Sequence, residues 1–117
     1  MRNYATTYTI PADTNNLGEP QPAIYITGLS LVASCTGSTP VANQPLGQFI
    51  FQVSNEEVAP GSFPTRWADL TSVQMAGNVE VSMSTINVAY RWVQVVYLYN
   101  QGTGGTITVD LWFQGPQ

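Results

Sequence analysis

The feature that most constrains the fold of this sequence is an alternation of apolar and polar residues with a period of two. Segment 106–113 shows it most clearly, because every second side chain there is apolar while Thr108, Asp110 and Trp112 occupy positions between them. Successive side chains of a β-strand point to opposite faces, so this pattern indicates a strand with one buried face. No window shows the periodicity of an amphipathic helix, and we therefore expect an all-β protein.

Further strands are expected along the rest of the chain. They span residues 4–10, 23–33, 47–54, 79–84 and 90–99, and a short element begins at 67–70. Segment 47–54 is apolar on both faces, as in a buried strand, and segment 90–99 has the β-branched and aromatic composition of a central strand. The glycine-rich stretch 100–105 predicts a turn that pairs segments 90–99 and 106–113 as an antiparallel hairpin.

About seven or eight strands separated by turn signals indicate a sandwich or a barrel. We expect a single antiparallel β-sandwich of the jelly-roll type, with an immunoglobulin-like sandwich as the alternative. The prolines and glycine of residues 11–22 predict an extended, irregular arm. We therefore divide the chain into an N-terminal strand and arm at residues 1–22 and a β-sandwich domain at residues 23–117.

Charged residues are few and mostly acidic. The chain contains no histidine and no lysine, its basic residues are Arg2, Arg66 and Arg91, and its net charge is −4. Histidine is the usual acid–base group near neutral pH, and lysine and arginine provide most of the affinity of nucleic-acid binders. The composition therefore argues against catalysis, and against nucleic acids and acidic membranes as partners.

The low charge also suggests what the protein does instead. Charged residues make up 9% of the chain, against about a quarter in typical soluble proteins. A surface with so few charges has little electrostatic protection against self-association, so we expect assembly with copies of itself. The alternative is a charge-poor extracellular β-protein.

No residue pattern predicts a catalytic or metal site. Glu56 and Glu57 are adjacent, so on an extended backbone their carboxylates point apart and cannot act as an acid–base pair. No histidine is present to activate a serine or Cys35, and a zinc site is excluded. Residues 13–16 and 55–57 offer oxygen ligands for calcium but lack the spacing of a known calcium loop, so we expect exposed turns. We therefore expect no enzyme activity, metal or cofactor.

Cys35 is the only cysteine, so no intrachain disulfide can form, and we expect it to fill a small apolar site. The sequence begins without the apolar stretch of a secretory signal. It also has no apolar run of membrane-spanning length. We therefore expect synthesis in a cytoplasm and no membrane partner.

Aromatic and proline residues are the candidates for contacts with partners. Trp112 stands out because the alternation places it opposite the apolar face of segment 106–113. We weigh three roles for it: an interface with a neighbouring subunit, a place in the core and a platform for a sugar ring. The arm can lie across a neighbouring subunit and add hydrogen bonds to an exposed sheet edge. The interface candidates are Tyr4, Tyr8, Pro11, Pro20, Pro22 and Trp112.

Two parts of the chain carry a family resemblance. They are GQFIFQVSNEE with RWADL near the middle, and NVAYRWVQVVYLYNQGTGGTITVDLW toward the end. Together they resemble small jelly-roll virion proteins of tailed bacteriophages, and their order is also similar to discoidin-like β-sandwiches. The resemblance implies that Ser54, Asn55 and Trp67 form a turn and its packing partner. It also implies that Arg91 and Trp92 lie on a central strand.

The resemblance covers about residues 47–114 and implies a structural rather than a catalytic role. With the low charge, it leads us to expect a protein that decorates or cements a capsid as a homotrimer. Its partners would be the major capsid protein or other virion proteins, and it would be made in the host cytoplasm and reside on the capsid surface. The alternative is a carbohydrate-binding module on a tail or head fibre, with Trp112 contacting the glycan. A tail or connector component is a third hypothesis.

Overall fold

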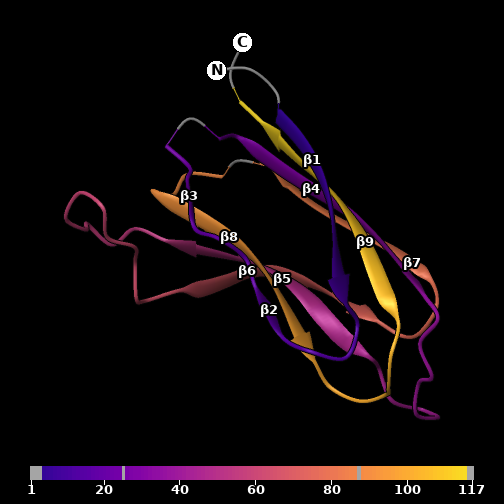
Figure 1. The fold of residues 1–117 in the computed structure, drawn as a ribbon. Coiled ribbons are helices and arrows are strands. Elements are labelled where there is room, and N and C mark those ends of the chain that lie inside the picture. Colours follow the sequence, from indigo (N-terminus) through magenta and orange to yellow (C-terminus); the bar gives the residue numbers. More distant parts are fainter. Residues whose placement is uncertain (1–3, 25, 87, 116–117) are drawn as a thin grey trace.

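The computed structural model describes residues 4–24, 26–86 and 88–115, with only the backbone of Tyr4. Within these ranges the chain forms nine β-strands and no helix (Figure 1). The strands are β1 (Tyr4–Pro11), β2 (Asn16–Leu17), β3 (Gln21–Pro22), β4 (Gly28–Thr36), β5 (Gly47–Ser54), β6 (Ala68–Met75), β7 (Glu80–Ile86), β8 (Trp92–Tyr99) and β9 (Thr106–Gln114). A helix long and apolar enough to cross a membrane is accordingly not found in the described ranges.

The strands form two antiparallel sheets. The first sheet has the order β1-β9-β4-β7, and the second has the order β2-β8-β5-β6 with β3 also paired to β8. Because β2 and β3 pair with the same neighbour, they act as two halves of one interrupted strand. Along the chain the strands alternate between the sheets except at the β5–β6 connection, which is the connectivity of a jelly roll. The expected all-β antiparallel sandwich of jelly-roll type is confirmed.

The core lies between the sheets and is built by the alternation seen in the sequence. Every second side chain of β9 from Ile107 to Phe113 is at most 7% exposed, whereas the residues between them are exposed. The second sheet contributes Phe49 and Tyr97, whose ring centroids lie 4.9 Å apart. Fully burying a large apolar side chain contributes about 1.5–3 kcal/mol, so these facing rows stabilise the sandwich.

The predicted hairpin between segments 90–99 and 106–113 is wrong. Strands β8 and β9 belong to different sheets, so residues 100–105 cross from the second sheet to the first. Thr103 in this loop forms an isolated β-bridge with Thr39, which anchors the crossing. A glycine-rich loop indicates that the chain reverses, but the sheet that receives the next strand depends on long-range burial.

Two further expectations need correction at their bounds. The strand expected at 23–33 begins only at Gly28, because the Ile26 amide donates to the Ala23 carbonyl in a turn before it. The short element expected from 67–70 is the beginning of β6, a strand of eight residues. In both cases the apolar pattern is correct, and the backbone hydrogen bonds decide where the strand begins or ends.

The N-terminal segment expected to form an arm packs on its own sandwich. Strand β1 pairs with β9 along its whole length, and β2 and β3 pair with β8. Between them the Gly18 amide donates to the Val95 carbonyl at 2.8 Å, and a Cβ at Gly18 would lie 2.2 Å from that oxygen. Only glycine allows this approach to β8. Ile10 and Ala12 belong to the shared core, so packing continues across the boundary expected at residue 22.

Candidate functional site

The outer face of the first sheet is one of two candidate functional surfaces. It consists of the outward-pointing residues of β1, β9, β4 and β7, which the strand register arranges in rows. One row places Trp112 of β9 between Ala5 of β1 and Ser30 of β4, with Ser84 of β7 beyond. Serine and threonine are the most frequent residues at the other positions of this face. The alternation that builds the core thus leaves a hydroxyl-rich surface with few charges on the opposite side.

The outer face of the first sheet holds two charged side chains among its described residues, Asp110 and Glu80. Both lie beside hydroxyl groups of a neighbouring strand. Thr7 Oγ1 donates to Asp110 Oδ1 at 2.7 Å, and Ser34 Oγ lies 3.5 Å from Glu80 Oε2. No described residue of this face is basic. The face therefore lacks the lysines that commonly protect sheets against association.

Trp112 lies on this outer face. Its side chain is 41% exposed, and Val32, diagonally across on β4, is 37% exposed. Ile86, at the end of β7, is 75% exposed. The expectation that Trp112 could lie in the core is wrong, because its neighbours in sequence fill the core and its strand is extended. Its remaining roles are those of an exposed aromatic, a subunit contact or a sugar platform.

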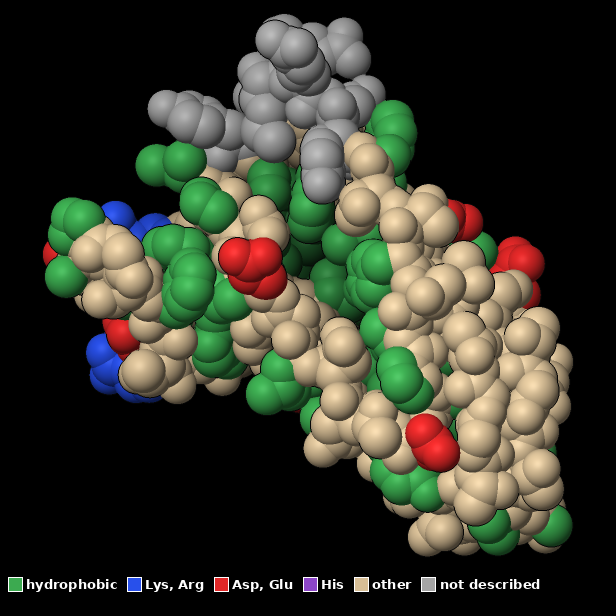
Figure 2. Space-filling model, viewed as in Figure 1, with side chains coloured by type: hydrophobic (Ala, Val, Ile, Leu, Met, Phe, Trp, Pro, Cys, Tyr) green, Lys and Arg blue, Asp and Glu red, His purple; other side chains and the backbone are tan. Residues whose placement is uncertain are grey.

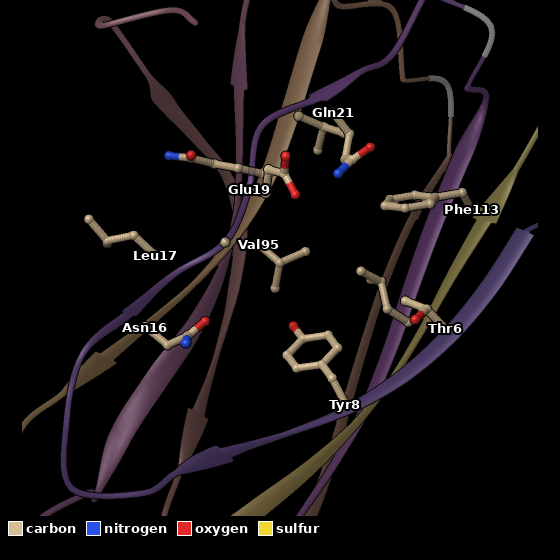
Figure 3. A pocket seen from close by; sticks show the side chains of 12 residues that line it. Thr6, Tyr8, Asn16, Leu17, Glu19, Gln21, Val95 and Phe113 are labelled. Atoms are coloured by element: carbon tan, nitrogen blue, oxygen red, sulfur yellow. The ribbon is translucent and has the colours of Figure 1, made fainter.

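The second candidate surface is a cleft between the sheets, where the edge strand β1 faces the β2–β3 segment; we call it the edge cleft. Its volume is about 360 Å³. Figure 2 shows a hollow with hydrophobic side chains inside, and Figure 3 shows the lining from close by. Its inner wall consists of inward-pointing residues of both sheets. They are Val93, Val95, Leu111 and Phe113.

Polar side chains surround the mouth of the edge cleft. Tyr8 of β1, with Asn16, Glu19 and Gln21 of the β2–β3 segment, extends toward this space (Figure 3). The Tyr8 phenol is protonated at neutral pH and can donate a hydrogen bond, and burial raises its pKa further above the ordinary value. Glu19 is the only charged residue among those that line the cleft, and none of them is basic. The edge cleft thus combines an apolar interior with hydroxyl, amide and carboxylate groups.

The two adjacent carboxylates of the loop after β5 engage different arginines. Glu56 Oε1 lies 3.3 Å from Arg66 Nε, and Glu57 Oε1 lies 3.2 Å from Arg91 Nη2. Ion pairs at the protein surface contribute little to stability, because water screens the two charges. Each of the two adjacent carboxylates therefore has its own arginine partner.

The residues that the family resemblance singles out lie around the same loop. Ser54 Oγ accepts a hydrogen bond from the backbone two residues on, and Asn55 Oδ1 accepts one from the Arg91 amide at 3.0 Å. The Trp67 indole donates to a carbonyl of its own loop. Trp92 begins β8, which is paired on both sides and is therefore a central strand, and Arg91 immediately precedes it.

One turn considered for calcium uses its oxygens within the protein. Asp13 Oδ2 accepts a hydrogen bond from the Gly104 amide at 3.0 Å, and Asn15 Oδ1 accepts one from the Tyr99 amide at 2.8 Å. Across the residues that the structure describes, no three acidic, cysteine or histidine side chains gather to hold a metal ion. These hydrogen bonds give the turn a structural role in joining the arm to β8 and its following loop.

The six interface candidates are not brought together at one place. Trp112 lies on the outer face of the first sheet, and Tyr8 lies in the edge cleft. Pro11 is exposed at the end of β1, Pro20 is half-buried, and Pro22 is exposed beside β8. The side chain of Tyr4 lies outside the described residues.

The edge cleft is not predicted by any pattern in the sequence. Its lining comes from residues 6–21, 93–95 and 111–113, which only the pairing of β1 with β9 and of β2 and β3 with β8 brings together. The one local signal is the alternation in segment 4–10, which places Thr6 and Tyr8 on the inward side of an edge strand. No spacing in the sequence indicates that Glu19 and Gln21 lie opposite them.

The chain is thus a small jelly-roll β-sandwich with two candidate binding surfaces. No family model matches its sequence, and no curated protein matches it significantly. Among solved structures, PirA is similar with a TM-score of 0.58 at 17% identity, covering 91% of both chains. A structure of Bacillus endospore appendages, described as a novel family of disulfide-linked pili, is similar with a TM-score of 0.51 at 14% identity, covering 98% of this chain and 90% of that one.

A third structure, the SPBc2 prophage-derived protein YomS, has a TM-score of 0.48 at 15% identity and covers 97% of this chain and 96% of its own. At these identities, the similarity to PirA and to the appendage protein establishes a shared overall fold and nothing about function.

Proposed function

We propose that this chain is a structural subunit that associates with copies of itself and with a larger protein shell, as a surface protein of a tailed-bacteriophage virion. The observation that carries the proposal is the outer face of the first sheet. Trp112 and Val32 are exposed there among serines and threonines, and no described residue of the face is basic. The family resemblance of residues 47–114 supports the virion assignment.

Desolvation favours this face as a contact surface. Burying an unpaired charge in an interface costs several kcal/mol, and the two carboxylates of this face, Asp110 and Glu80, each lie beside a hydroxyl of a neighbouring strand. Serine and threonine hydroxyls can instead exchange water for a partner's backbone groups at little net cost. An exposed tryptophan is the residue type most enriched at the centre of interfaces, so Trp112 is the expected anchor.

The finer proposal is a trimer that decorates or cements the capsid. The first sheet ends at β1 on one side and β7 on the other, and neither edge is covered by another strand of this sheet. A contact between β1 of one copy and β7 of the next is heterologous. Repeated contacts of this kind close into a ring when the rotation between copies allows it, as in a trimer.

The appendage protein supplies a comparison for how a jelly roll can assemble. That protein forms disulfide-linked pili. In the present chain Cys35 is the only cysteine of the sequence, and it is 3% exposed in the core. Any assembly of this chain would therefore be non-covalent, and its oligomeric mass should not change when a reducing agent is added.

Native mass spectrometry tests the self-association. The chain mass is 12.7 kDa, and a trimer would show three times that value. Trp112→Ser should raise the dissociation constant of the oligomer about tenfold or more, because it removes the anchor of the face. Phe63→Ser is the matched control, since Phe63 is a comparably exposed aromatic, 51% against 41%, on the loop between β5 and β6. A wild-type protein that stays monomeric at high concentration would contradict the proposal.

The virion assignment has its own experiment. Mass spectrometry of purified phage particles should detect the chain. An electron-density map of the intact particle should then place it on the capsid surface. Density on the tail or connector would keep the structural role but overturn the capsid assignment. Absence of the chain from particles would overturn both.

A further inference from the structure

The edge cleft points to a second binding function, separate from self-association. We propose that it binds an uncharged pyranose ring of a glycan. The cleft opens between β1 and the β2–β3 segment, whereas the assembly face lies on the outer side of the first sheet. Strand β1 borders the cleft and is also the edge used in the proposed trimer, whereas Trp112 does not line the cleft. Glycoside binding and oligomeric mass are measured separately, so either proposal can fail without the other.

The cleft exists because the strand formed by β2 and β3 is interrupted. Each half is two residues long, and between them Gly18 is drawn onto β8 by its hydrogen bond to Val95. Fewer side chains therefore cover the core at this edge than along a continuous strand. Leu111 and Phe113 each keep 7% exposure at the bottom of the cleft. The volume of about 360 Å³ lies at the lower end of the range for small-molecule sites, which is about 300–1,000 Å³.

The groups at the mouth suit a ligand with one apolar face and several hydroxyls. The aromatic ring of Tyr8 and the apolar interior provide a surface for the C–H face of a pyranose. The Glu19 carboxylate accepts hydrogen bonds, and the Gln21 amide both donates and accepts. In Figure 3 these two side chains lie across the cleft from Tyr8. A carboxylate and an amide at one mouth can bind neighbouring hydroxyls of the same ring.

Charge decides against other ligands. No basic residue lines the cleft, and Glu19 contributes a negative charge. Phosphates, sulfated sugars and uronic acids would therefore be repelled without a compensating cation. An apolar peptide side chain from a second copy would leave the Glu19 and Gln21 groups without partners. A neutral sugar satisfies the polar groups and also covers the apolar interior.

The test uses the full-length protein and a panel of methyl glycosides of glucose, galactose, mannose and N-acetylglucosamine, with methyl glucuronide as the anionic control. Binding is followed by saturation-transfer NMR and by amide shifts of the labelled protein. For so small a ligand we expect a dissociation constant of about 1 mM. Shifts should concentrate at residues 16–21 and 93–95, and affinity should not depend on salt. Methyl glucuronide should bind more weakly than the neutral glycosides because Glu19 repels its carboxylate, and binding of the glucuronide alone would overturn the proposal.

Variants locate the site. Glu19→Ala and Gln21→Ala should each weaken binding about tenfold, because each removes a hydrogen-bonding group that faces the ligand. Both residues lie outside the buried core, and folding is checked by the amide spectrum. Gln74→Ala, an exposed amide on β6 away from the cleft, is the matched control and should bind like the wild type.

Tyr8→Phe keeps the aromatic ring and should lose only part of the affinity. The proposal is overturned if no glycoside of the panel binds the folded protein. It is also overturned if binding survives both Glu19→Ala and Gln21→Ala. Loss of binding in Trp112→Ser alone would place the sugar on the outer face of the first sheet instead, and would likewise overturn the assignment to the cleft.

Discussion

The hydroxyl of Tyr97 donates a hydrogen bond of 2.7 Å to the carbonyl oxygen of Ala12. Tyr97 lies on β8 of the second sheet and is 1% exposed, and Ala12 follows β1 of the first sheet and is fully buried. The bond therefore joins the two sheets at the point where the N-terminal segment crosses between them. Because both groups are removed from water, neither has an alternative partner in solvent.

Tyr97→Phe should lower the free energy of unfolding by about 1–3 kcal/mol, because it leaves the Ala12 carbonyl buried without its donor. Urea denaturation followed by tryptophan fluorescence measures the change. Tyr90→Phe is the control on a half-buried tyrosine, and we expect it to change stability by less than about 0.5 kcal/mol. Equal stability of Tyr97→Phe and wild type would show that the bond contributes nothing.

Stability should fall at alkaline pH through the same residue. Burial, with smaller contributions from the nearby Cys35, Tyr99 and Asp13, raises the pKa of Tyr97 from 10 to about 12. Between these values the unfolded chain has released the phenol proton and the folded chain has kept it. The unfolded state then binds fewer protons, so stability decreases as pH rises from 10 to about 12.

Denaturation midpoints measured across that pH range check this prediction. Tyr97→Phe should show a shallower decline, with the remainder coming from Tyr8 and Cys35, whose pKa values burial also raises. An identical decline in the variant and the wild type would assign the alkaline loss to other groups.

Gly18→Ala should detach the N-terminal segment from β8. The added Cβ would lie 2.2 Å from the Val95 carbonyl oxygen, a backbone atom that cannot move aside. We expect the free energy of unfolding to fall by about 1–3 kcal/mol. The backbone amides around Gly18 should also exchange their hydrogens with solvent faster. Gly77→Ala is the control, since its Cβ would meet its nearest atom at an ordinary 3.6 Å. A wild-type exchange rate in Gly18→Ala would argue against the close approach.

Deleting residues 1–22 should abolish cooperative folding. The deletion removes β1, the edge strand of the first sheet, and the buried Ile10 and Ala12. It would also expose the apolar floor of the edge cleft. Circular dichroism and thermal melting check this outcome. A folded, cooperatively melting fragment of residues 23–117 would instead mean that the N-terminal segment is dispensable and free to exchange between subunits.

The thiol of Cys35 should be unreactive in the folded protein. Cys35 is 3% exposed and burial raises its pKa, so the thiolate needed for alkylation is scarce and shielded. Iodoacetamide labelling should be slow under native conditions and fast in denaturant. Rapid native labelling would show that the core opens around β4.

The alternation in segment 106–113 predicted both the strand and its buried face correctly. The face on which a strand residue lies depends on local periodicity, so the type of each residue in this segment indicates whether its face is buried. Segment 90–99 contains the expected central strand, which begins at Trp92 rather than at residue 90. The hairpin between them failed because β8 and β9 extend along different sheets. Nothing local to the 100–105 loop distinguishes a turn within one sheet from a crossing between two.

The edge cleft shows the same limit. Tyr8, Glu19 and Phe113 are far apart in the chain and meet only because β1 pairs with β9 while the β2–β3 segment pairs with β8. The all-β class and the buried faces of the clearest strands could be predicted from the sequence, because they follow from residue type and spacing. The low charge is read from the composition directly. Only the tertiary structure shows which strands are neighbours, that Trp112 on the outer face remains exposed, and that a cleft opens at the interrupted strand. Strand pairing depends on the total burial in both sheets, and the residues of one short segment do not determine that total.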